Sequence, residues 1–340
     1  MIRLAVAGAA HGHVRYALDE ADRRAGIELV ALSEPHRDDR ERWTPPGVPS
    51  YADHAEMLQA HTPDVVAVCG VYGERADVVV EALHAGAHVI ADKPLCTELE
   101  DLGRIAAAAA TTGRHVSLML EKRWYPATLA ARRLVEDGVL GTLALISSTG
   151  PHQLRRRTRP PWFFRRDGYG DLLGDLPVHD VDLVLALTGA TGGTVTGVAP
   201  RRPFADAPEF CDSGALVMTA GEVTATIEAH WLWPDASAVT APYRMRLTGT
   251  EGVADIDWWT GEVSVRTDTP DAWRPSTPAG LRPAEQALTA LAAGIAPEVA
   301  TAESLAASRV ALLAARSAHS GSRPLNWSLP AETPSAPRLP

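Results

Sequence analysis

The chain has 340 residues, of which 46% are apolar and 22% are charged, and its formal net charge is −10. This length suits two domains, and the composition is that of a globular protein with enough apolar residues to form a core. The negative charge argues against nucleic acid or an anionic membrane surface as a partner, because both would repel the chain.

The cysteines Cys69, Cys96 and Cys211 are widely spaced and form no Cys/His ligand pattern. We therefore expect neither a disulfide framework nor a metal site. No basic segment followed by a long apolar one stands near residue 1, and no run approaches the roughly 18 apolar residues that a membrane helix needs. We expect a cytoplasmic protein that does not bind membranes.

A βαβ unit is predicted at the start of the chain. Ile2–Ala7 is a nearly continuous apolar run, typical of a strand buried on both faces. His13–Arg24 carries apolar residues at helical spacing, and Leu29–Leu32 is a second apolar run that is followed by Ser33 and Glu34. An acid at the end of the second strand of such a unit can bind a ribose diol, so Glu34 is a candidate cofactor ligand.

The loop after the first strand departs from the usual dinucleotide fingerprint, G-x-G-x-x-G. Gly8 stands at the first position, Ala10 and His13 stand at the second and third, and Gly12 comes one residue early. Alanine still permits a close backbone approach, and the start of the helix offers amides and its dipole to a pyrophosphate. His11 and His13 either contact that pyrophosphate or are simply exposed loop residues.

Strands and helices continue to alternate up to about residue 120. The predicted elements are a helix over 53–60, a strand over 65–69, a helix over 76–85, a strand over 89–91, a helix over 98–111 and a strand over 116–120. This order predicts a parallel, doubly wound sheet, so we expect residues 1–122 to form an α/β Rossmann dinucleotide-binding domain. Asp92, Lys93 and Pro94 directly follow one strand, at the sheet edge where such folds bind ligands.

Residues 123–330 have a different character. The predicted elements are a helix over 128–137, a strand over 143–148, an arginine-rich loop over 153–166, a buried helix over 172–187, strands from 195 to 265, and helices over 281–293 and 302–317. Repeated strands with turns at Gly221, Gly249 and Gly261 indicate a large open, mostly antiparallel sheet. We expect an α+β domain for substrate binding and oligomerisation, with an edge strand at Leu325–Trp327 and a proline-rich tail over 331–340.

Two polar residues stand near the start of the predicted buried helix. Asp175 and His179 are four residues apart, so their side chains are expected to share one face. Pro177 suits the first turn of a helix, which places Asp175 at the N-terminal end of that helix. Histidine titrates near neutrality and can take or give a proton. Taken alone, the pair is better explained by a helix cap and a buried, hydrogen-bonded histidine.

Five stretches, in order, carry a resemblance to a known family. They are Asp92–Pro94, Arg123–Pro126, Asp175–Asp182, Gly249–Gly252 and Ala302–Gly321. They resemble five segments of the Gfo/Idh/MocA family, which is named after glucose-fructose oxidoreductase, inositol dehydrogenase and rhizopine catabolism. In the same order, the family segments are Glu-Lys-Pro, Arg-aromatic-x-Pro, Asp-x-Gly-x-His-x-x-Asp, GTEG and the closing helix. The resemblance implies that His179 is the acid/base, that Lys93 hydrogen-bonds the reacting oxygen, and that Asp175 orients a neighbouring hydroxyl.

The chain departs from the family pattern after the third long strand of the first domain. It reads Gly70-Val-Tyr72-x-x-Arg75 where the family has Thr-Pro-Asn-x-x-His, so contacts near the nicotinamide are expected to differ. The resemblance places Tyr72, Arg75, Asp92 and Lys93 on the cofactor side. It places Arg123, Trp124, Tyr125, Trp162 and Arg165 on the substrate side.

Glu34 favours NAD as the cofactor, because a carboxylate accepts hydrogen bonds from ribose hydroxyls and repels a 2′-phosphate. His36 and Arg37 could instead bind that phosphate, so NADP stays an alternative. The arginine-rich loop over 155–166 could receive an anionic substrate, although a solvated loop, or a loop that reaches into a partner subunit, is the better explanation.

The leading hypothesis is an NAD(P)-dependent oxidoreductase that transfers hydride to or from a secondary alcohol of a sugar, a cyclitol or a sugar derivative. The alternatives are a cofactor-binding regulator without turnover, and a redox-neutral enzyme with tightly bound NAD, such as one that cleaves glycosides. Trp231, Trp233, Trp258 and Trp259 lie on the predicted sheet. Because an aromatic sheet face tends to be covered, we expect a homodimer or homotetramer that packs through it.

Overall fold

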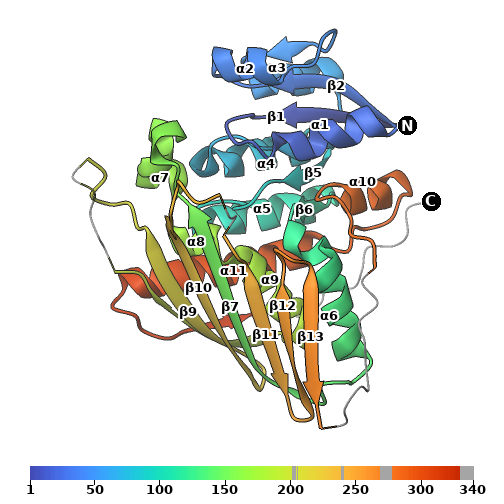
Figure 1. Cartoon of the computed structure of the whole chain (residues 1–340). Coiled ribbons are helices and arrows are strands. Elements are labelled where there is room, and N and C mark those ends of the chain that lie inside the picture. Colours follow the sequence, from blue (N-terminus) through green and yellow to red (C-terminus); the bar gives the residue numbers. More distant parts are fainter. Residues whose placement is uncertain (201–203, 205, 239–240, 269–277, 330–340) are drawn as a thin grey trace.

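The chain folds around two sheets, which lie one above the other in Figure 1. The computed structural model describes residues 1–200, 204, 206–238, 241–268 and 278–329. The tail predicted over 331–340 lies outside these residues. The predicted fold class, a Rossmann domain followed by a mostly antiparallel sheet domain, is confirmed.

The first sheet is parallel and has the strand order β3-β2-β1-β4-β5-β6. Its strands are β1 (Ile2–Ala7), β2 (Ile27–Ser33), β3 (Ser50–Tyr51), β4 (Val65–Val68), β5 (His88–Ala91) and β6 (Val116–Leu118). Its helices are α1 (Val14–Arg23), α2 (Arg37–Trp43), α3 (His54–His61), α4 (Arg75–His84) and α5 (Leu99–Thr112). The order reverses between β1 and β4, which is the point where ligands bind in this class of sheet.

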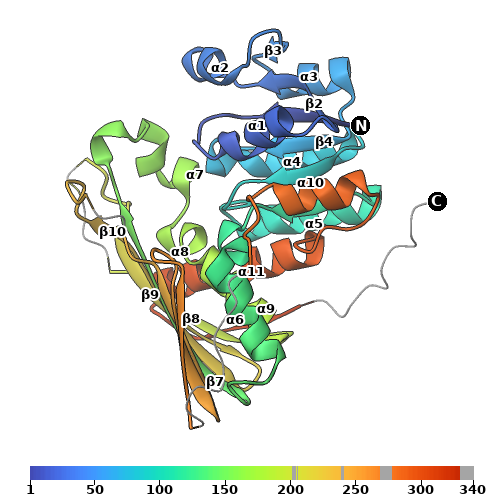
Figure 2. The same ribbon diagram turned by 45° about the vertical axis from the view of Figure 1, so that its right-hand side comes forward.

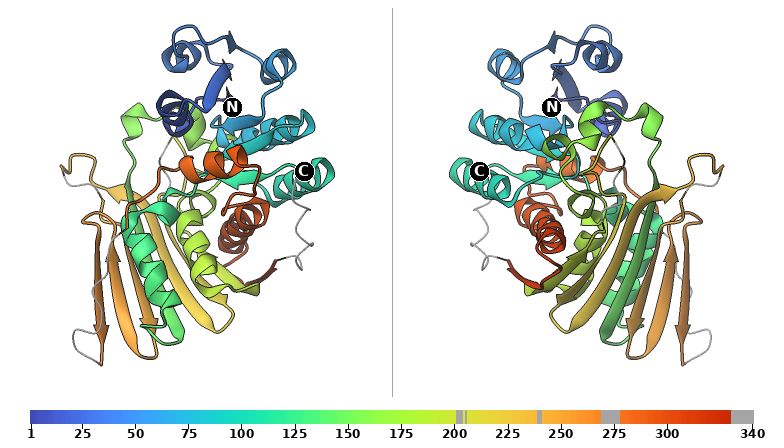
Figure 3. Two further views of the ribbon diagram at one scale, coloured as in Figure 1. Left: turned by 90° about the vertical axis from the view of Figure 1, so that its right-hand side faces the viewer. Right: turned by 90° about the vertical axis from the view of Figure 1, so that its left-hand side faces the viewer.

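The apolar run of β1 is explained by burial on both faces. Leu4 and Val6 belong to one core cluster, whereas Ala5 and Ala7 belong to the cluster on the opposite side of the sheet. Helices cover both sides of this sheet (Figure 3). The sequence did not predict α2 and β3, because α2 buries none of its residues and β3 has only two.

The second sheet has the strand order β13-β12-β11-β7-β10-β9-β8-β14. Its strands are β7 (Leu143–Gln153), β8 (Gly192–Val198), β9 (Ser213–Ala220), β10 (Val223–Trp233), β11 (Arg244–Gly249), β12 (Gly252–Asp257), β13 (Glu262–Thr267) and β14 (Leu325–Ser328). The prediction of a mostly antiparallel sheet is confirmed, and the one parallel pair among its described strands is β10 with β7. The helices between β7 and β10 supply the long crossover that a parallel pair requires.

One face of this sheet is packed and the other is bare (Figure 2). The described helices of this part of the chain are α6 (Pro126–Glu136), α7 (Arg166–Tyr169), α8 (Leu172–Asp175), α9 (Val178–Thr188), α10 (Glu285–Ala292) and α11 (Thr301–His319). The predicted helix over 172–187 is interrupted, because Pro177 starts α9 and separates it from α8. Asp175 therefore ends α8, and His179 lies in the first turn of α9.

The C-terminal helices tie the two sheets together. The edge strand β6 donates Val116 N–H to Thr301 Oγ1 (3.0 Å) and Leu118 N–H to Ser304 Oγ (2.9 Å), and both acceptors lie on α11. These bonds satisfy backbone groups at the sheet edge, which would otherwise be open. Helix α11 thus places the first sheet above the second.

The expectation of an aromatic outer face on the second sheet is wrong for two of its tryptophans. Trp231 is 6% exposed and belongs to the inner core, and Trp258 donates its ring N–H to Thr128 of α6. The alternation of β10 points Trp231 inward and leaves Thr226 and Glu228 on the outer face. Trp259 is 52% exposed, but it lies in the turn after β12.

Candidate functional site

The carboxylate of Asp92 joins the first loop to the end of β5. It is fully buried and contacts three side chains: His11 Nδ1 at 2.9 Å, His13 Nδ1 at 2.8 Å and Arg75 Nη2 at 2.8 Å. The loop lies very close to β4, because a Cβ on Gly8 would come within 2.4 Å of Gly70 Cα and Gly8 has a φ of +84°. The two histidines are therefore held in place and are not free loop residues.

The charges of this cluster determine its protonation. Burial opposes the charged form of Asp92, but His13 and Arg75 outweigh it and hold the pKa of Asp92 well below its usual range. Burial lowers the pKa of His11 to about 4, whereas Asp92 and then Glu121 outweigh burial at His13 and raise its pKa. His11, His13 and Asp92 offer ligand atoms within 4.8 Å of one another, but Arg75 and the hydrogen bonds already satisfy the carboxylate.

Arg75 and Tyr72 were predicted to lie at the cofactor. In the structure Arg75 contacts the Asp92 carboxylate, and the Tyr72 ring lies 5.8 Å from the ring of His11. The Arg75 guanidinium is fully buried and donates to the backbone oxygens of Gly70, Asp92 and Pro94. Its Cζ lies 4.3 Å from the centre of the Tyr72 ring. These contacts leave Arg75 positioned to orient Asp92, and its predicted contact with a cofactor stays a prediction.

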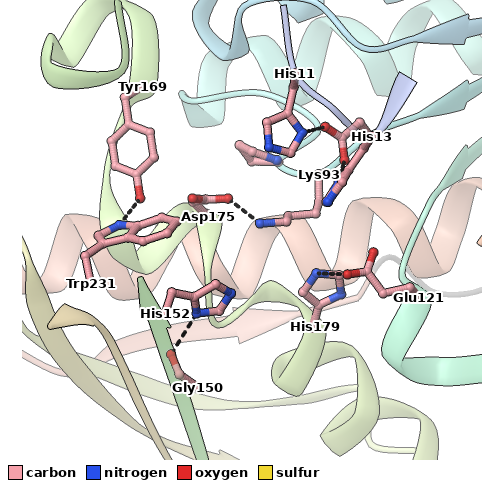
Figure 4. Close-up of polar contacts among 12 residues, drawn as sticks. His11, His13, Lys93, Glu121, Gly150, His152, Tyr169, Asp175, His179 and Trp231 are labelled. Atoms are coloured by element: carbon pink, nitrogen blue, oxygen red, sulfur yellow. Dashed lines mark hydrogen bonds and ion pairs between the residues drawn. The ribbon is translucent and has the colours of Figure 1, made fainter. Parts of the chain in front are cut away.

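Lys93 and Asp175 meet between the two sheets. Lys93 Nζ donates to Asp175 Oδ1 at 2.8 Å, and the two residues are 5% and 0% exposed. Figure 4 shows Lys93 and Asp175 pointing toward each other across the site, with Tyr169 and Trp231 beyond them. Trp231 Nε1 donates to the Tyr169 hydroxyl at 2.9 Å, and burial and then Asp175 raise the pKa of Tyr169 well above its usual range.

His179 lies below Lys93 and faces Glu121 (Figure 4). Its Nε2 is 3.9 Å from Glu121 Oε1, and the residue is 4% exposed. Burial lowers the pKa of His179 well below its usual value, and the positive charges of Lys93 and Lys122 lower it further. The position in the first turn of α9 acts in the same direction, because a helix N-terminus disfavours a positive charge.

The structure adds His152 and Glu121 to the predicted site. His152 Nδ1 donates to the Gly150 carbonyl (3.0 Å), and burial and then Lys93 lower the pKa of His152 well below its usual value. The sequence prediction ended this strand at Ser148, whereas β7 continues to Gln153 and brings His152 into the site. Glu121 could have been found, because it follows β6 at the same sheet edge as Lys93.

The chain contains two lysines, Lys93 and Lys122, and both are buried at this site. Lys122 Nζ donates to both carboxylate oxygens of Asp180, at 3.0 and 2.9 Å. It also lies 4.8 Å from the ring centre of Tyr243 and 4.7 Å from that of Trp258. Its charge is therefore matched, and its ammonium is enclosed between aromatic rings.

Glu34 is placed where a Rossmann fold binds adenosine. Its carboxylate accepts from Ala9 N–H at 2.6 Å and from His36 N–H at 2.9 Å, and the residue is 4% exposed. It lines a small cavity together with Gly8, Pro35, His54, Gly70, Val71 and others. Ala10 and Gly12 lie in the same loop. The cavity between this acid and the glycine of the first loop lies where this class of fold binds the ribose of a dinucleotide.

The predicted substrate residues are not brought together. Arg123 is 5% exposed and forms a buried two-bond ion pair with Asp182. Trp124 is 4% exposed and belongs to a core cluster, and Arg165 is exposed and paired with Asp167. Trp162 packs against Tyr72 with ring centres 5.0 Å apart, at the edge of the site.

Tyr125 is half-buried, and burial and then Glu121 raise its pKa, which places it near that carboxylate. Gly73 lies against the loop that carries Trp162, because a Cβ on Gly73 would lie 1.8 Å from Asp167 O. The loop over 153–170 thus packs directly on the first domain.

Within the described part of the chain, no helix is both long and apolar enough to span a bilayer.

Comparison with known proteins follows the same division of the chain. Residues 2–120 match the model of an oxidoreductase family with an NAD-binding Rossmann fold, and residues 128–255 match the C-terminal domain of the same Gfo/Idh/MocA family. Inositol 2-dehydrogenase of Rhizobium meliloti is 23% identical over 168 residues, which are 48% of this chain and 49% of that protein. D-apiose dehydrogenase of Paraburkholderia graminis is 26% identical over 236 residues, 67% of this chain and 60% of that protein.

The alignments therefore span less than two thirds of either relative. Among solved structures, the WlbA dehydrogenase of Chromobacterium violaceum, determined with NADH and UDP-GlcNAcA, superposes with a TM-score of 0.83 at 18% identity, covering 97% of this chain and 96% of that one. At this identity the likeness establishes the fold. Together with the two family models, it shows that this chain is a member of the Gfo/Idh/MocA oxidoreductase family, with an NAD-binding Rossmann domain.

Proposed function

We propose that the protein transfers a hydride between NAD and a secondary alcohol of a sugar or cyclitol, with Lys93, Asp175 and His179 as catalytic residues. The observation that carries this proposal is the Lys93–Asp175 contact of 2.8 Å beside the buried His179. The three side chains meet where β5 ends at the sheet edge, next to the Gly8 loop. Their burial excludes bulk water, which would weaken every charge interaction in the site.

The nicotinamide ring, when bound, supplies the acceptor or donor of the hydride. His179, with a pKa well below its usual value, is neutral near pH 7 and can take the hydroxyl proton. The Lys93 ammonium donates a hydrogen bond to the same oxygen and lowers its proton affinity. The Asp175 carboxylate accepts from Lys93 through Oδ1, and it can also accept a hydrogen bond from a neighbouring hydroxyl.

For the cofactor, Glu34 supports NAD over NADP. Its carboxylate is fixed by two backbone N–H groups, those of Ala9 and His36. A fixed negative charge at this position accepts hydrogen bonds from the ribose and repels a 2′-phosphate. Arg37, which could have bound that phosphate, is instead paired with Glu41 on the surface of α2.

The substrate class is proposed from the named relatives and from the polar site. An inositol dehydrogenase and an apiose dehydrogenase both act on polyhydroxylated compounds by their names. The buried acceptors around Lys93 suit a ligand with several hydroxyl groups. A panel of inositols, pentoses and hexoses distinguishes the members of this class.

We also propose that a second copy of the chain covers the outer face of the second sheet. This face exposes Leu145 (54%) and Val217 (48%), beside the ion pairs of Arg244 with Asp257 and Arg246 with Asp255. An uncovered sheet with apolar and charged groups in rows can pair with itself. Light scattering and Leu145→Asp test this: the variant should shift the protein toward monomer.

The test of activity is absorbance of the reduced nicotinamide on mixing purified protein and NAD with inositols, pentoses and hexoses. A signal that disappears in His179→Ala would support the proposal. If NAD binds but no member of the panel reacts, the cofactor-binding regulator becomes the better explanation. If NAD instead co-purifies with the protein and is released only when the protein is denatured, a redox-neutral enzyme with tightly bound NAD becomes the better explanation.

A further inference from the structure

Unsatisfied polar atoms gather at one place in this molecule. Among the described residues, four buried side-chain nitrogen or oxygen atoms have no hydrogen-bond partner: Glu121 Oε2, Asp175 Oδ2, His179 Nδ1 and Arg156 Nη1. Three of the four belong to side chains that surround Lys93 (Figure 4). Because a buried polar atom without a partner costs free energy, a cluster of them indicates a place prepared for a polar ligand.

Two of these three residues already have roles in the proposed reaction, but Glu121 has none. It is the first residue of a short helical turn, Glu121–Trp124, which follows β6. Its side chain is 15% exposed, and its Oε1 is 3.9 Å from His179 Nε2. Its charge also affects His13 on the cofactor side and Tyr243, which directly precedes β11. Glu121 therefore lies between the cofactor loop and the acid/base.

The nearby cations are already matched by other carboxylates. Lys93 is paired with Asp175, and Lys122 is paired with Asp180. Within the described chain, the one ion-pair contact of Glu121 is with His179, and burial holds the pKa of His179 so low that its ring is neutral near pH 7. A buried carboxylate in this situation needs hydrogen-bond donors.

Three arginines of the arginine-rich loop already have partners within the chain. Arg156 is paired with Asp206 and Arg165 with Asp167. Arg159 lies over the rings of Phe163 and Trp231 and donates to the Leu154 carbonyl. Among the carboxylates around Lys93, Asp175 and Asp180 are hydrogen-bonded to cations, and Glu121 is the one that is not.

We propose that Glu121 determines substrate specificity, by accepting a hydrogen bond from a hydroxyl or amino group close to the reacting carbon and by excluding a carboxylate or phosphate from that position. The inference rests on the proposed function, since it uses the same site and His179 as the acid/base. A carboxylate can only accept, so Glu121 Oε2 and Asp175 Oδ2 together require donors on the ligand. The substrate class is therefore an uncharged or amino-bearing polyol.

The test compares Glu121→Gln and Glu121→Met with the control Glu100→Gln, which changes an exposed glutamate of α5. The ligand pairs are D-glucose with D-glucuronate and myo-inositol with myo-inositol 1-phosphate. Binding to the NADH-loaded protein is measured by calorimetry, and turnover with NAD gives kcat and KM separately. Thermal unfolding of each variant shows that the fold is retained.

The wild type is expected to bind the neutral member of a pair more tightly. Glu121→Met should raise Kd and KM for the neutral ligand by about 10- to 100-fold, the loss of one hydrogen bond to a charged group, with kcat changed much less. Glu121→Gln keeps a carbonyl acceptor but loses the charge, so it should retain most neutral binding and reduce the preference over the anionic member at least about tenfold. Glu100→Gln should match the wild type.

Three results would overturn the inference. The first is tighter wild-type binding of an anionic member, and the second is a preference that Glu121→Gln leaves unchanged. The third is an equal loss for all ligands with a displaced pH profile of kcat, which would mean that Glu121 acts through His179. Polyols that bind without hydride transfer would contradict the proposed function and leave the specificity result standing, whereas no polyol binding at all would contradict the inference.

Discussion

Lys93 at the end of β5 donates to Asp175 at the end of α8, and this 2.8 Å contact joins the two sheets of the molecule. The residues are 82 positions apart in the sequence. The first domain alone would present Lys93 without its carboxylate, and the second would present Asp175 as an unpaired buried charge. The site is therefore a product of the docking of the two parts.

Lys93→Met should lower turnover by at least about 100-fold, because it removes the charge that stabilises the developing alkoxide. Affinity for NAD should change little, since Glu34 and the Gly8 loop are untouched. Single-turnover absorbance measures the first quantity, and quenching of protein fluorescence by NADH measures the second. Turnover above a tenth of the wild-type value would contradict the assigned role.

The pH profile of alcohol oxidation should reflect the pKa of His179, which burial and then Lys93 lower well below the usual value. A base with a lowered pKa stays unprotonated, and so stays competent, as the pH falls through 6.5. We expect kcat for oxidation to show no loss between pH 7.5 and about 6. A decline with an apparent pKa between 6 and 7 would show that His179 titrates normally.

Glu34 should give the protein at least about a tenfold preference for NAD over NADP, because its fixed carboxylate repels the 2′-phosphate. Glu34→Ser should reduce this preference and also weaken NAD, because Ala9 N–H loses its acceptor. Titration with NADH and NADPH measures both affinities. Glu28→Ser, which changes an exposed glutamate near the start of β2, is the matched control and should leave the preference unchanged.

Arg123→Ala should destabilise the protein by roughly 3–5 kcal/mol, because it leaves the buried Asp182 carboxylate without its cation. Urea unfolding measures the loss. Arg132→Ala, which breaks a more exposed pair with Glu298, should cost about 1 kcal/mol or less. Equal effects of the two substitutions would refute the structural role of Arg123. The double variant Arg123→Met/Asp182→Leu replaces the ion pair by apolar side chains and should recover much of the stability.

His88 should make the fold less stable in acid. Its Nδ1 accepts from His115 N–H at 3.0 Å, and burial, then His115 and Arg114, lower its pKa to about 4. The unfolded chain, with an ordinary pKa of about 6.5, binds a proton before the folded one, so stability is full above pH 6.5 and falls between pH 6.5 and 4. His88→Gln should make the free energy of unfolding depend less on pH across that window. An unchanged slope in urea titrations at pH 7.5, 6, 5 and 4.5 would rule this out.

Much of the local structure could be predicted because it depends on neighbours in the sequence. The apolar run of β1, the helical spacing of α1 and the stop at Pro94 each follow from local residue chemistry. The position of Lys93 follows too, since the end of a parallel strand is where this class of sheet binds ligands. Helix α2 and strand β3 were not predicted, because they bury few residues and so leave little hydrophobic pattern in the sequence.

The pairing of charged residues that are far apart in the sequence could not be predicted, and only the tertiary structure shows it. Nothing in the sequence indicated that Arg75 pairs with Asp92, or that Arg123 pairs with Asp182. The sequence by itself determined which segments are strands and helices, where they stop, and that the chain forms a Rossmann domain and an open sheet. Only the packing of the two sheets decided which charges are paired and which, such as that of Glu121, remain available for a ligand, because pairing depends on distances across the fold that hydrophobic periodicity does not encode.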